Sequence, residues 1–449
     1  MRLPETSPSL PAMMREFHQL DETAQLRLID ESDALDPKGR YLHWDQIRRR
    51  PPPGGLSHRT WWLGFVLARR TGRQRLPLSG KGGVPFWFCN ASPVMEALQR
   101  LDREMAGHIL LDEEVVSSGE KDRYLVSSLM EESIRSSQLE GANTTRLIAQ
   151  EMLRTGRRPR DQGERMIFNN FAAMLQVEEW AQEDRAVTPD RLLALHEIVT
   201  LNTLKSQADS GRIQVPGEGR VAVVSGDGSV VHTPPPAEEL PQRIERLCAF
   251  ANGELDDRYL HPGIRASMCH FMLGYDHPFV DGNGRTARAL FYWTMLRSGY
   301  WLASYLSISN LLRAGPSKYS RAYEYVHADA NDATYFLIHQ LNVLERAADQ
   351  LRQYIARQTA QAARIAQALK DLRGLNRRQE LVVERALRLP FTEFTVAGHQ
   401  TEFRVSYGTA RSDLIRLVQR GLLLREQEGR HYFFRPAPDL EERLGATVD

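Results

Sequence analysis

Apolar residues recur every three to four positions along most of the chain, the spacing that places them on one face of a helix. RYLVSSLMEESIRSSQLE, MIFNNFAAMLQVEEWAQE and RTARALFYWTMLRSG are examples, and short polar breaks separate such runs. The pattern therefore predicts a mainly α-helical fold. Residues 121–348 form its largest block, and residues 349–373 predict a helix that links this block to the end of the chain.

One segment within the helical block has the period of a strand instead. GRVAVVSGDGSVVHTPPP alternates on both sides of Asp227-Gly228, and an Asp-Gly pair between alternating segments is a strong hairpin signal. We predict a β-hairpin over Val221–Thr233, which includes Val231 and His232. A lone hairpin that ends in a run of prolines within a helical domain indicates a flap over a site.

Two further regions flank the helical block. Residues 1–120 contain a proline-bearing, partly ordered lead-in up to about residue 40, a helix that opens at Ser57 and a short strand, PFWFCN. The pattern assigns no role to this region. SGKGG at residues 79–83 lacks the spacing and the hydroxyl of a phosphate-binding P-loop. Residues 374–449 predict a helix, a glycine and a strand–turn–strand, the order of a winged helix-turn-helix.

The candidate recognition helix of that last unit spans Thr409–Arg420 and carries Arg411, Arg416 and Arg420. These arginines could contact DNA phosphates. Asp413 lies among them in the sequence, however, and a DNA-binding helix usually shows a clearer basic face. Two interpretations therefore stay open: DNA binding, and recognition of a protein partner or of a second copy of this chain, which is at least as well supported.

Composition narrows the class of protein without naming a function. Lys and Arg number 58 against 57 Asp and Glu, so no global charge points to nucleic acid or to a membrane surface. No apolar run is long enough to span a bilayer, and the N-terminus lacks the pattern of a secretory signal. Cys89, Cys248 and Cys269 form no C-x-x-C pair, so we predict three buried thiols in a cytoplasmic protein.

The densest group of reactive residues is HPFVDGNGRTAR, which starts at His277. Pro278 should end the preceding helix, and the next helix should begin near Arg285. The loop between them then lies at a helix N-terminus, where free N–H groups and the helix dipole attract an anion. Gly282 and Gly284 allow the backbone to approach a ligand closely. The loop is therefore a candidate phosphate site.

Side chains of the same stretch complete such a site. Arg285 and Arg288 are about one helical turn apart, so both can reach toward the same anion. Asp281 offers a hard oxygen ligand for Mg²⁺, which prefers one or two carboxylates besides phosphate oxygens. His277 can act as a general base near neutral pH. We assign the earlier histidine, His270, to the core.

This stretch resembles the core motif of the Fic (filamentation induced by cAMP) family, H-x-F-x-[DE]-G-N-G-R-x-x-R, without a mismatch. The resemblance implies a Fic-type helical bundle with a β-hairpin flap over about residues 122–348, followed by a winged helix. It implies transfer of AMP from ATP to a Ser, Thr or Tyr hydroxyl of a target protein or of the enzyme itself. It also implies that the flap, with Val231 and His232, holds the target segment by strand addition.

The resemblance further implies a role for each residue of the motif. His277 would deprotonate the attacking hydroxyl, Phe279 would anchor the loop in the core, and Asp281 would hold Mg²⁺ on the α- and β-phosphates. The nucleotide-binding residues would be Gly282, Asn283, Gly284, Arg285, Thr286, Ala287, Arg288 and Tyr319. Gly284 separates this chain from Doc-type relatives, which carry Lys there and act as kinases. Ser320 stands where the family has a second Tyr beside Tyr319, which weakens the assignment of Tyr319.

SIRSSQLEGANTT is the second informative stretch. Ser136 and Glu140 are four residues apart, hence on one helical face, and Gly141 suits a helix C-cap. The stretch resembles the family's inhibitory motif, [ST]-x-x-x-E-[GN]. This implies that the helix of about residues 122–141 is inhibitory: Glu140 would pair with Arg288, and ATP would bind in a non-productive pose.

Three functions stay open on the sequence alone. We favour an autoinhibited protein adenylyltransferase that uses ATP and Mg²⁺, because sensing a nucleotide needs the anion loop but not a base such as His277. The second is a DNA-binding regulator whose Fic core senses a nucleotide. The third is a Fic enzyme that mainly removes AMP, because in some relatives the inhibitory glutamate supports that reaction. A homodimer is compatible with each of them.

Overall fold

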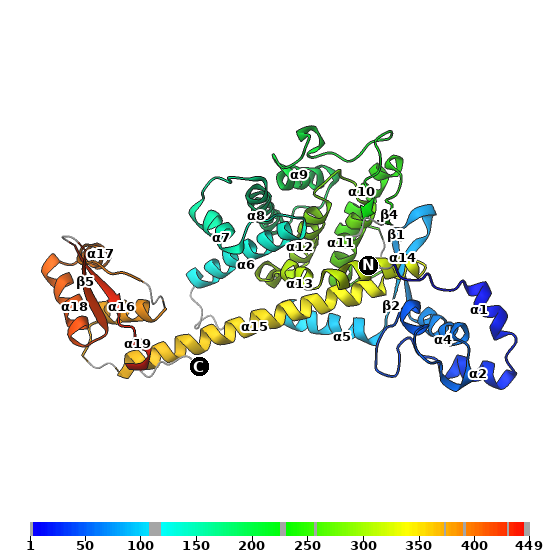
Figure 1. Cartoon of the computed structure of the whole chain (residues 1–449), viewed down its shortest axis with the longest axis horizontal. Coiled ribbons are helices and arrows are strands. Elements are labelled where there is room, and N and C mark those ends of the chain that lie inside the picture. Colours follow the sequence, from blue (N-terminus) through cyan, green and yellow to red (C-terminus); the bar gives the residue numbers. More distant parts are fainter. Residues whose placement is uncertain are drawn as a thin grey trace. The chain divides into compact units, whose positions relative to one another are not determined.

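The computed structural model describes residues 3–106, 118–224, 230–255, 258–371, 374–388, 392–428 and 431–443. Its described part is mainly helical, as predicted, and its strands form three two-stranded sheets (Figure 1). The chain divides into two compact units, the first of which ends at Leu351 while the second continues from Arg352. The boundaries that we predict between domains stay a prediction.

The first unit contains most of the elements. Its helices are α1 (Leu10–Phe17), α2 (Glu22–Asp30), α3 (Trp44–Ile47), α4 (His58–Thr71), α5 (Ser92–Leu101), α6 (Ser118–Leu139), α7 (Arg146–Thr155), α8 (Gln162–Gln182), α9 (Pro189–Thr200), α10 (Leu240–Asn252), α11 (Pro262–Asp276), α12 (Asn283–Arg297), α13 (Ile308–Ala314) and α14 (Pro316–Ala328). Its strands are β1 (Arg73–Ser79), β2 (Pro85–Cys89), β3 (Val223–Val224) and β4 (Val230–His232). Helix α15 (Thr334–Asp371) begins in this unit and confirms the long helix predicted before the end of the chain.

Helices α11 and α12 form the centre of the first unit and pack along each other. Both are buried on nearly all sides, because apolar residues surround their axes rather than forming one stripe. Helices α6, α8 and α9 pack around α12, and α10 packs on α11 (Figure 1). The loop that joins the two central helices is therefore held on a rigid, fully packed pair.

The N-terminal lead-in is more ordered than we expect from its prolines. Helices α1 and α2 occupy it, and both pack against α4. The prediction of a partly ordered segment fails because amphipathic residues such as Met13 and Phe17 find an apolar partner surface on α4. The predicted helix start at Ser57 is confirmed, since Ser57 Oγ accepts a hydrogen bond from Thr60 N as an N-cap.

The strand predicted at PFWFCN is confirmed as β2, which pairs with β1 in an antiparallel hairpin. The SGKGG segment is the turn of this hairpin, and Gly82 and Gly83 both adopt positive φ there. It joins two strands rather than a strand and a helix, so it has no P-loop geometry.

The predicted flap is also a hairpin, because β3 and β4 pair antiparallel with Val223 opposite His232. Its predicted turn at Asp227-Gly228 lies outside the described residues. The base of the flap is tied to the end of α11: His232 Nε2 lies 2.7 Å from the carbonyl oxygen of Tyr275. The flap therefore starts from the same helix end that leads into the HPFVDGNGRTAR loop.

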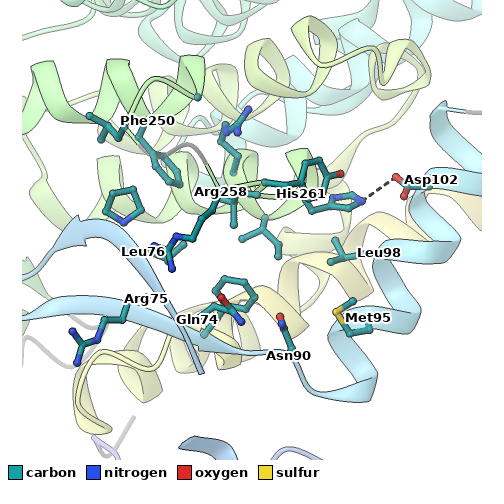
Figure 2. Close-up of a pocket in the computed structure, with 18 of the residues that line it drawn as sticks. Gln74, Arg75, Leu76, Asn90, Met95, Leu98, Asp102, Phe250, Arg258 and His261 are labelled. Atoms are coloured by element: carbon teal, nitrogen blue, oxygen red, sulfur yellow. Dashed lines mark hydrogen bonds and ion pairs between the residues drawn. The ribbon is translucent and has the colours of Figure 1, made fainter. Parts of the chain in front are cut away.

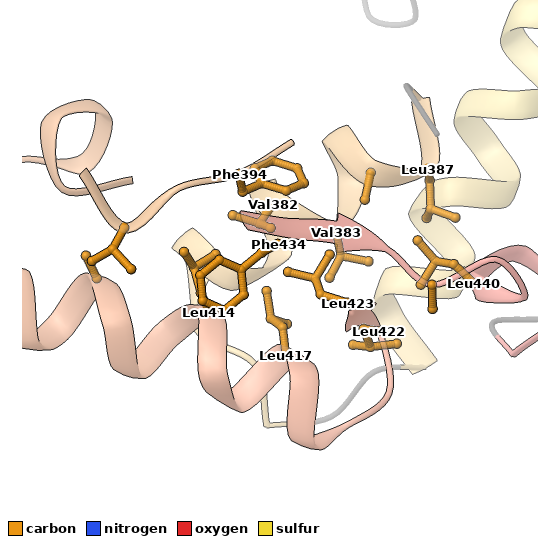
Figure 3. Close-up of a cluster of buried hydrophobic side chains, with 14 residues drawn as sticks. Val382, Val383, Leu387, Phe394, Leu414, Leu417, Leu422, Leu423, Phe434 and Leu440 are labelled. Carbon is orange, nitrogen blue, oxygen red and sulfur yellow. The ribbon is translucent and has the colours of Figure 1, made fainter. Parts of the chain in front are cut away.

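The second unit contains α16 (Arg377–Arg388), α17 (Val396–Phe403), α18 (Tyr407–Gln419), β5 (Leu423–Glu428), β6 (His431–Pro436) and α19 (Leu440–Arg443). Leu414, Leu417, Leu423 and Phe434 are among the buried residues of its core, to which both the helices and the antiparallel β5–β6 hairpin contribute (Figure 3). Three helices and a hairpin follow the element order of a winged helix-turn-helix.

The structure separates Asp413 from the arginines among which it lies in the sequence. The Asp413 carboxylate points into the unit, where it accepts hydrogen bonds from Arg378 Nε at 2.7 Å and from Asn376 Nδ2 at 2.7 Å. Asp413 is buried, whereas Arg411 and Arg416 are exposed. The acid therefore does not lie with the exposed arginines of α18, because Arg378 and Asn376 bind its carboxylate inside the unit.

The prediction of three unpaired, buried cysteines is confirmed. Burial raises the pKa of the Cys269 thiol to about 12, so this side chain is an inert part of the core. Across the described ranges, every helix is too short or too polar to cross a bilayer.

Candidate active site

The candidate site forms where α11 ends and α12 begins. His277 is the C-cap of α11 and has φ +44° and ψ +55°, a left-handed conformation that is uncommon for a residue with a side chain. Gly282 is the N-cap of α12 and has φ +84°, which glycine adopts without strain. Helix α12 begins at Asn283, slightly earlier than the start near Arg285 that we predict.

The backbone of the loop is clamped by the side chain of Asn283. Its Oδ1 accepts from Phe279 N at 2.9 Å, and its Nδ2 donates to Phe279 O at 2.8 Å. Thr286 Oγ1 donates to Gly282 O at 2.9 Å. These contacts give Asn283 and Thr286 a loop-shaping part in the geometry, and they leave the backbone N–H groups at the start of α12 available to a ligand.

Phe279 is fully buried and stacks on the ring of His196, with ring centroids 3.7 Å apart. This is the anchoring geometry that the resemblance implies. His196 also places its Nε2 2.8 Å from Asp281 O and accepts from Gly211 N at 3.0 Å through Nδ1. The sequence analysis did not find His196, because a histidine in an amphipathic helix has no distinguishing pattern before the chain folds.

Arg288 is held from one side by helix α6. Arg288 Nε donates to Ser136 Oγ at 2.8 Å, and Arg288 Nη2 donates to Ser136 O at 3.1 Å and to Glu140 Oε1 at 2.9 Å. Arg288 is only 2% exposed, so a carboxylate and a hydroxyl replace its water shell. The structure thus contains the ion pair of Glu140 and Arg288, which we call the inhibitory pair; its effect on activity stays a prediction.

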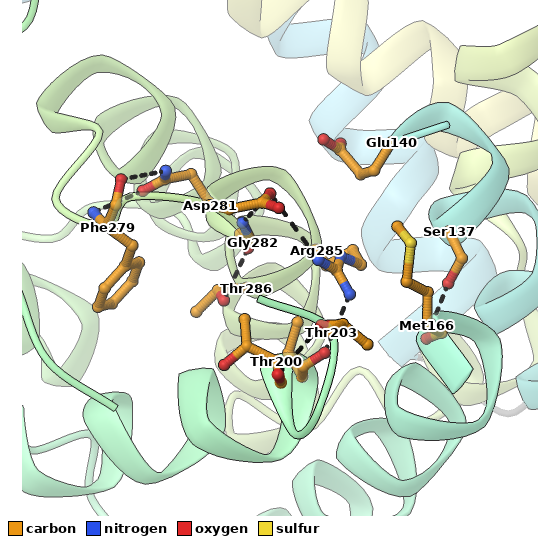
Figure 4. A network of polar contacts seen from close by, with 12 residues as sticks. Ser137, Glu140, Met166, Thr200, Thr203, Phe279, Asp281, Gly282, Arg285 and Thr286 are labelled. Carbon is orange, nitrogen blue, oxygen red and sulfur yellow. Dashed lines mark hydrogen bonds and ion pairs between the residues drawn. The ribbon is translucent and has the colours of Figure 1, made fainter. Parts of the chain in front are cut away.

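The Glu140 carboxylate, which Figure 4 labels, also lies close against Gly284. A Cβ atom at position 284 would overlap Glu140 Oε1, so the close approach needs glycine. This end of α12 is the place where a helix attracts an anion. A side-chain carboxylate therefore lies against the end of α12 that attracts anions.

The two arginines of the motif make different contacts in this state. Arg285 Nη1 donates to Val199 O at 2.9 Å, and Arg285 Nη2 lies 3.9 Å from Asp281 Oδ1 (Figure 4). Arg285 Nε is buried and has no hydrogen-bond partner among the described residues. Arg285 thus braces the loop against α9, whereas Arg288 faces α6.

The Asp281 side chain is accessible to a metal ion from solvent. It is 59% exposed, and one oxygen, Oδ1, accepts from Gly282 N at 2.5 Å. A single hard carboxylate next to an anion position fits Mg²⁺ with phosphate oxygens as further ligands.

His277 is prepared to accept a proton. Burial lowers the pKa of His277 below the ordinary value, and the neighbouring Glu140 charge opposes part of this shift. The imidazole is therefore neutral at pH 7, the form that a general base needs. Its backbone is fixed as well, because Arg220 Nη2 donates to His277 O at 3.1 Å and to Asp276 O at 2.6 Å.

Arg243 connects this helix end with the N-terminal region. Arg243 Nη1 donates to Asp276 Oδ1 at 3.0 Å and to Ser79 O at 2.9 Å, and its Nη2 donates to Gly80 O at 3.0 Å. The Tyr275 hydroxyl accepts from Lys81 N at 2.9 Å. The β1–β2 hairpin therefore braces the residues that precede His277, a contribution that the sequence analysis did not assign to residues 1–120.

The remaining predicted residues lie at the edges of the site. Tyr319 OH is 2.8 Å from His270 Nε2, and His270 is fully buried as predicted. Tyr319 also interacts with the Arg288 guanidinium. Gly141 has φ +95° just beyond the last residue of α6, which confirms the predicted C-cap. Nucleotide contact by Tyr319 stays a prediction.

A cavity of about 450 Å³ lies away from the HPFVDGNGRTAR loop, between the β1–β2 hairpin, α5 and the end of α10 (Figure 2). Leu76, Leu98 and Phe250 supply its apolar walls. Its polar end contains the pair of His261 Nε2 and Asp102 Oδ1, 2.9 Å apart. It contains no residue of the HPFVDGNGRTAR loop, so we place the candidate chemistry at the loop and not in this cavity.

Comparison with known proteins agrees with this location. Residues 186–295 match the Fic/DOC family model. The protein adenylyltransferases Fic of Drosophila grimshawi and Drosophila melanogaster are 39% and 41% identical over 69 residues. Each of these matches covers 15% of this chain and only 14% of the relative.

A crystal structure of a Fic family protein from Desulfovibrio desulfuricans G20 has a similar fold, with a TM-score of 0.53 and 18% sequence identity. The alignment covers 78% of this chain and 98% of that chain. The Fic/DOC match contains the flap and the whole loop, whereas the helix that carries Glu140 lies before it.

Proposed function

For a chain whose residues 186–295 are a Fic domain, we propose the function of a protein adenylyltransferase that transfers AMP from ATP to a hydroxyl group of a protein. One observation carries the proposal. The start of α12, which attracts anions, lies beside Arg288 and His277, and the Glu140 carboxylate of the same chain lies against this end of α12 and pairs with Arg288.

The proposed step balances in atoms and charge. The hydroxyl oxygen of the target attacks the α-phosphorus, the bond from the α-phosphorus to the α–β bridging oxygen breaks, and pyrophosphate leaves. His277 accepts the hydroxyl proton. Asp281 would hold Mg²⁺, which supplies charge neutralisation on the phosphates. The N–H groups at the start of α12 and the Arg288 guanidinium stabilise the remaining negative charge.

The inhibitory pair explains why the described state is not the active one. Arg288 cannot bind a terminal phosphate while it donates to Ser136 and Glu140. The Glu140 carboxylate would also repel that phosphate. We therefore infer that Glu140 keeps ATP out of the productive pose.

Three forms of the full-length protein test the proposal with ATP labelled at the α-phosphate and Mg²⁺. Glu140→Gly should transfer label covalently to protein, at least about tenfold faster than the unmodified protein, because a charged hydrogen bond of about 1.5–3 kcal/mol is removed. Glu140→Gly/His277→Ala should lose the transfer by about 10²–10⁴-fold, the usual contribution of a general base.

Two results would contradict the proposal. One is the absence of covalent α-label in all three forms while ATP binding is intact, which favours the nucleotide-sensing regulator. The other is release of AMP from a labelled protein by the unmodified form, but not by Glu140→Gly, without any transfer from ATP; this favours the enzyme that removes AMP.

DNA binding by the second unit remains a second candidate function, and one observation favours it. The outer face of α18 exposes Arg411 and Arg416, and the acid between them in sequence, Asp413, is turned into the core. Exposed arginines on a winged helix can contact phosphates.

A further inference from the structure

Helix α6 carries a buried carboxylate, Glu132, on the same face as Glu140. Glu132, Ser136 and Glu140 follow one another at four-residue intervals, so their side chains form one row along the helix. Glu132 is only 1% exposed. Glu131, its neighbour in sequence, points elsewhere and pairs with Arg135 at 2.8 Å.

Glu132 caps the first turn of α13. Its Oε2 accepts from Ser309 N at 2.9 Å and from Ser307 Oγ at 3.0 Å, and its Oε1 accepts from Ser309 Oγ at 2.5 Å. Ser307 is the N-cap residue of α13, but its own side chain makes no cap hydrogen bond. A carboxylate from α6 therefore supplies the acceptor that the first turn of α13 requires.

The row on α6 faces a matching row on α12. Gly284, Arg288 and Tyr292 also follow at four-residue intervals. Glu140 lies over Gly284 and contacts Arg288. At the other end Glu132 caps α13, and Ile308 N in the first turn of α13 donates to the Tyr292 hydroxyl at 3.0 Å. A shift of α6 by one turn, about 5.4 Å, would break the contacts of Glu140 and Glu132 together.

Glu140 itself has little to hold it in place apart from its ion pair. It follows the last residue of α6, Leu139, and its side chain is 30% exposed. A partly exposed carboxylate at a helix end loses its geometry when the helix moves or frays. The position of Glu140 therefore depends on how firmly α6 is attached further along.

We propose that Glu132 is a positioning residue for the inhibitory pair: by capping α13, whose first turn is bonded to Tyr292 of α12, it holds α6 in the register that places Glu140 on Arg288. The inference rests on the proposed AMP transfer. Glu132 touches neither the nucleotide position nor the reacting atoms, so it acts through Glu140.

Packing alone does not account for a carboxylate at this buried position, because its desolvation costs free energy. Burial raises the pKa of Glu132, and the donors on Ser309 oppose the shift. An apolar side chain of similar volume avoids that desolvation cost. The role that explains the carboxylate is its hydrogen bonding to Ser307 and Ser309, which fixes the register of α6 against α13.

Four variants of the full-length protein test the inference: Glu132→Gln, the control Glu131→Gln, Glu140→Gly, and Glu132→Gln/Glu140→Gly. Transfer of α-labelled AMP should rise about tenfold in Glu132→Gln, a change of about 1.4 kcal/mol, and stay unchanged in Glu131→Gln. The double variant should match Glu140→Gly within about twofold, because without Glu140 there is no carboxylate to position.

Hydrogen exchange of the α6 amides gives a readout that does not depend on activity. Exchange should be faster over residues 133–140 in Glu132→Gln and unchanged there in Glu131→Gln. Unchanged exchange in Glu132→Gln overturns the inference. AMP transfer by Glu132→Gln at the rate of the unmodified protein also overturns it. A double variant clearly slower than Glu140→Gly would overturn it too, because that result identifies a purely structural role for Glu132.

The variants distinguish failure of the proposed AMP transfer from failure of the proposed role of Glu132. If Glu140→Gly transfers no AMP, the proposed function fails, and the inference falls with it. If Glu140→Gly transfers AMP and Glu132→Gln does not differ from Glu131→Gln, only the inference fails.

Discussion

Helices α12 and α18 both carry arginines, and they use them in opposite ways. Arg285 and Arg288 of α12 are almost fully buried and already bound to fixed acceptors of the same unit. Arg411 and Arg416 of α18 are exposed on the surface of the second unit. The first pair is pre-organised, and the second keeps its conformational freedom.

The difference shows where a ligand can be recognised precisely. A buried arginine has lost its water shell and its rotamer freedom during folding, so a phosphate that displaces its internal partner meets a fixed charge. An exposed arginine must be ordered at the moment of binding and is screened by salt. We therefore expect a large, specific effect from α12 and a small, salt-dependent one from α18.

The largest effect is expected at Arg288. In the Glu140→Gly background, Arg288→Ala should reduce AMP transfer by about 10²–10³-fold, as removal of a fixed donor to transition-state charge does. Arg297→Ala is the matched control, because Arg297 lies in the last turn of the same helix and pairs with Asp184. Steady-state rates with α-labelled ATP decide the matter; equal losses in both variants would mean that α12 is merely destabilised.

A substitution in the core of the second unit should separate stability from activity. Leu414 is fully buried among the residues of Figure 3, and Leu414→Ala should cost about 2–5 kcal/mol of the stability of that unit. AMP transfer by Leu414→Ala/Glu140→Gly should stay within about twofold of that by Glu140→Gly. Calorimetry of the full chain and the label assay check this, and a parallel fall of activity would show that the second unit controls the active site.

The smallest effect on stability is expected from Arg411→Ala/Arg416→Ala, below about 0.5 kcal/mol, because both side chains are exposed. The same variant sharpens the question of DNA. If the unmodified protein retards duplex DNA at low salt, the retardation should weaken in this variant and persist in Arg377→Ala, an exposed arginine on α16. Equal mobility of DNA with all forms would favour a protein partner for α18.

Local patterns were enough to predict the elements of the site. Periodicity and capping residues predicted the central helices, the cap at Ser57, the flap hairpin and the turn at Gly141, because these depend on neighbours within one or two helical turns. The lead-in was predicted less well. Its helices α1 and α2 are short and form against α4, and a partner from elsewhere in the chain does not show in a local pattern.

Contacts between distant segments were beyond a local pattern. His196 stacks on Phe279, Arg243 joins the β1–β2 hairpin to Asp276, and Glu132 caps α13 across 177 positions of sequence. None of these residues has a spacing that marks it. The sequence prediction for Asp413 failed for the related reason that its partners, Asn376 and Arg378, come from an earlier part of the chain.

The sequence alone determined the helical class, the glycine turn from Gly282 to Gly284 at the start of a helix and the histidine just before it, because backbone conformation follows from residue types in order. Only the tertiary structure decided which partner each charge meets. It brought the Glu140 carboxylate over Gly284 and left Arg285 against α9, because those contacts depend on how whole helices pack, and packing is settled by the complete set of buried surfaces.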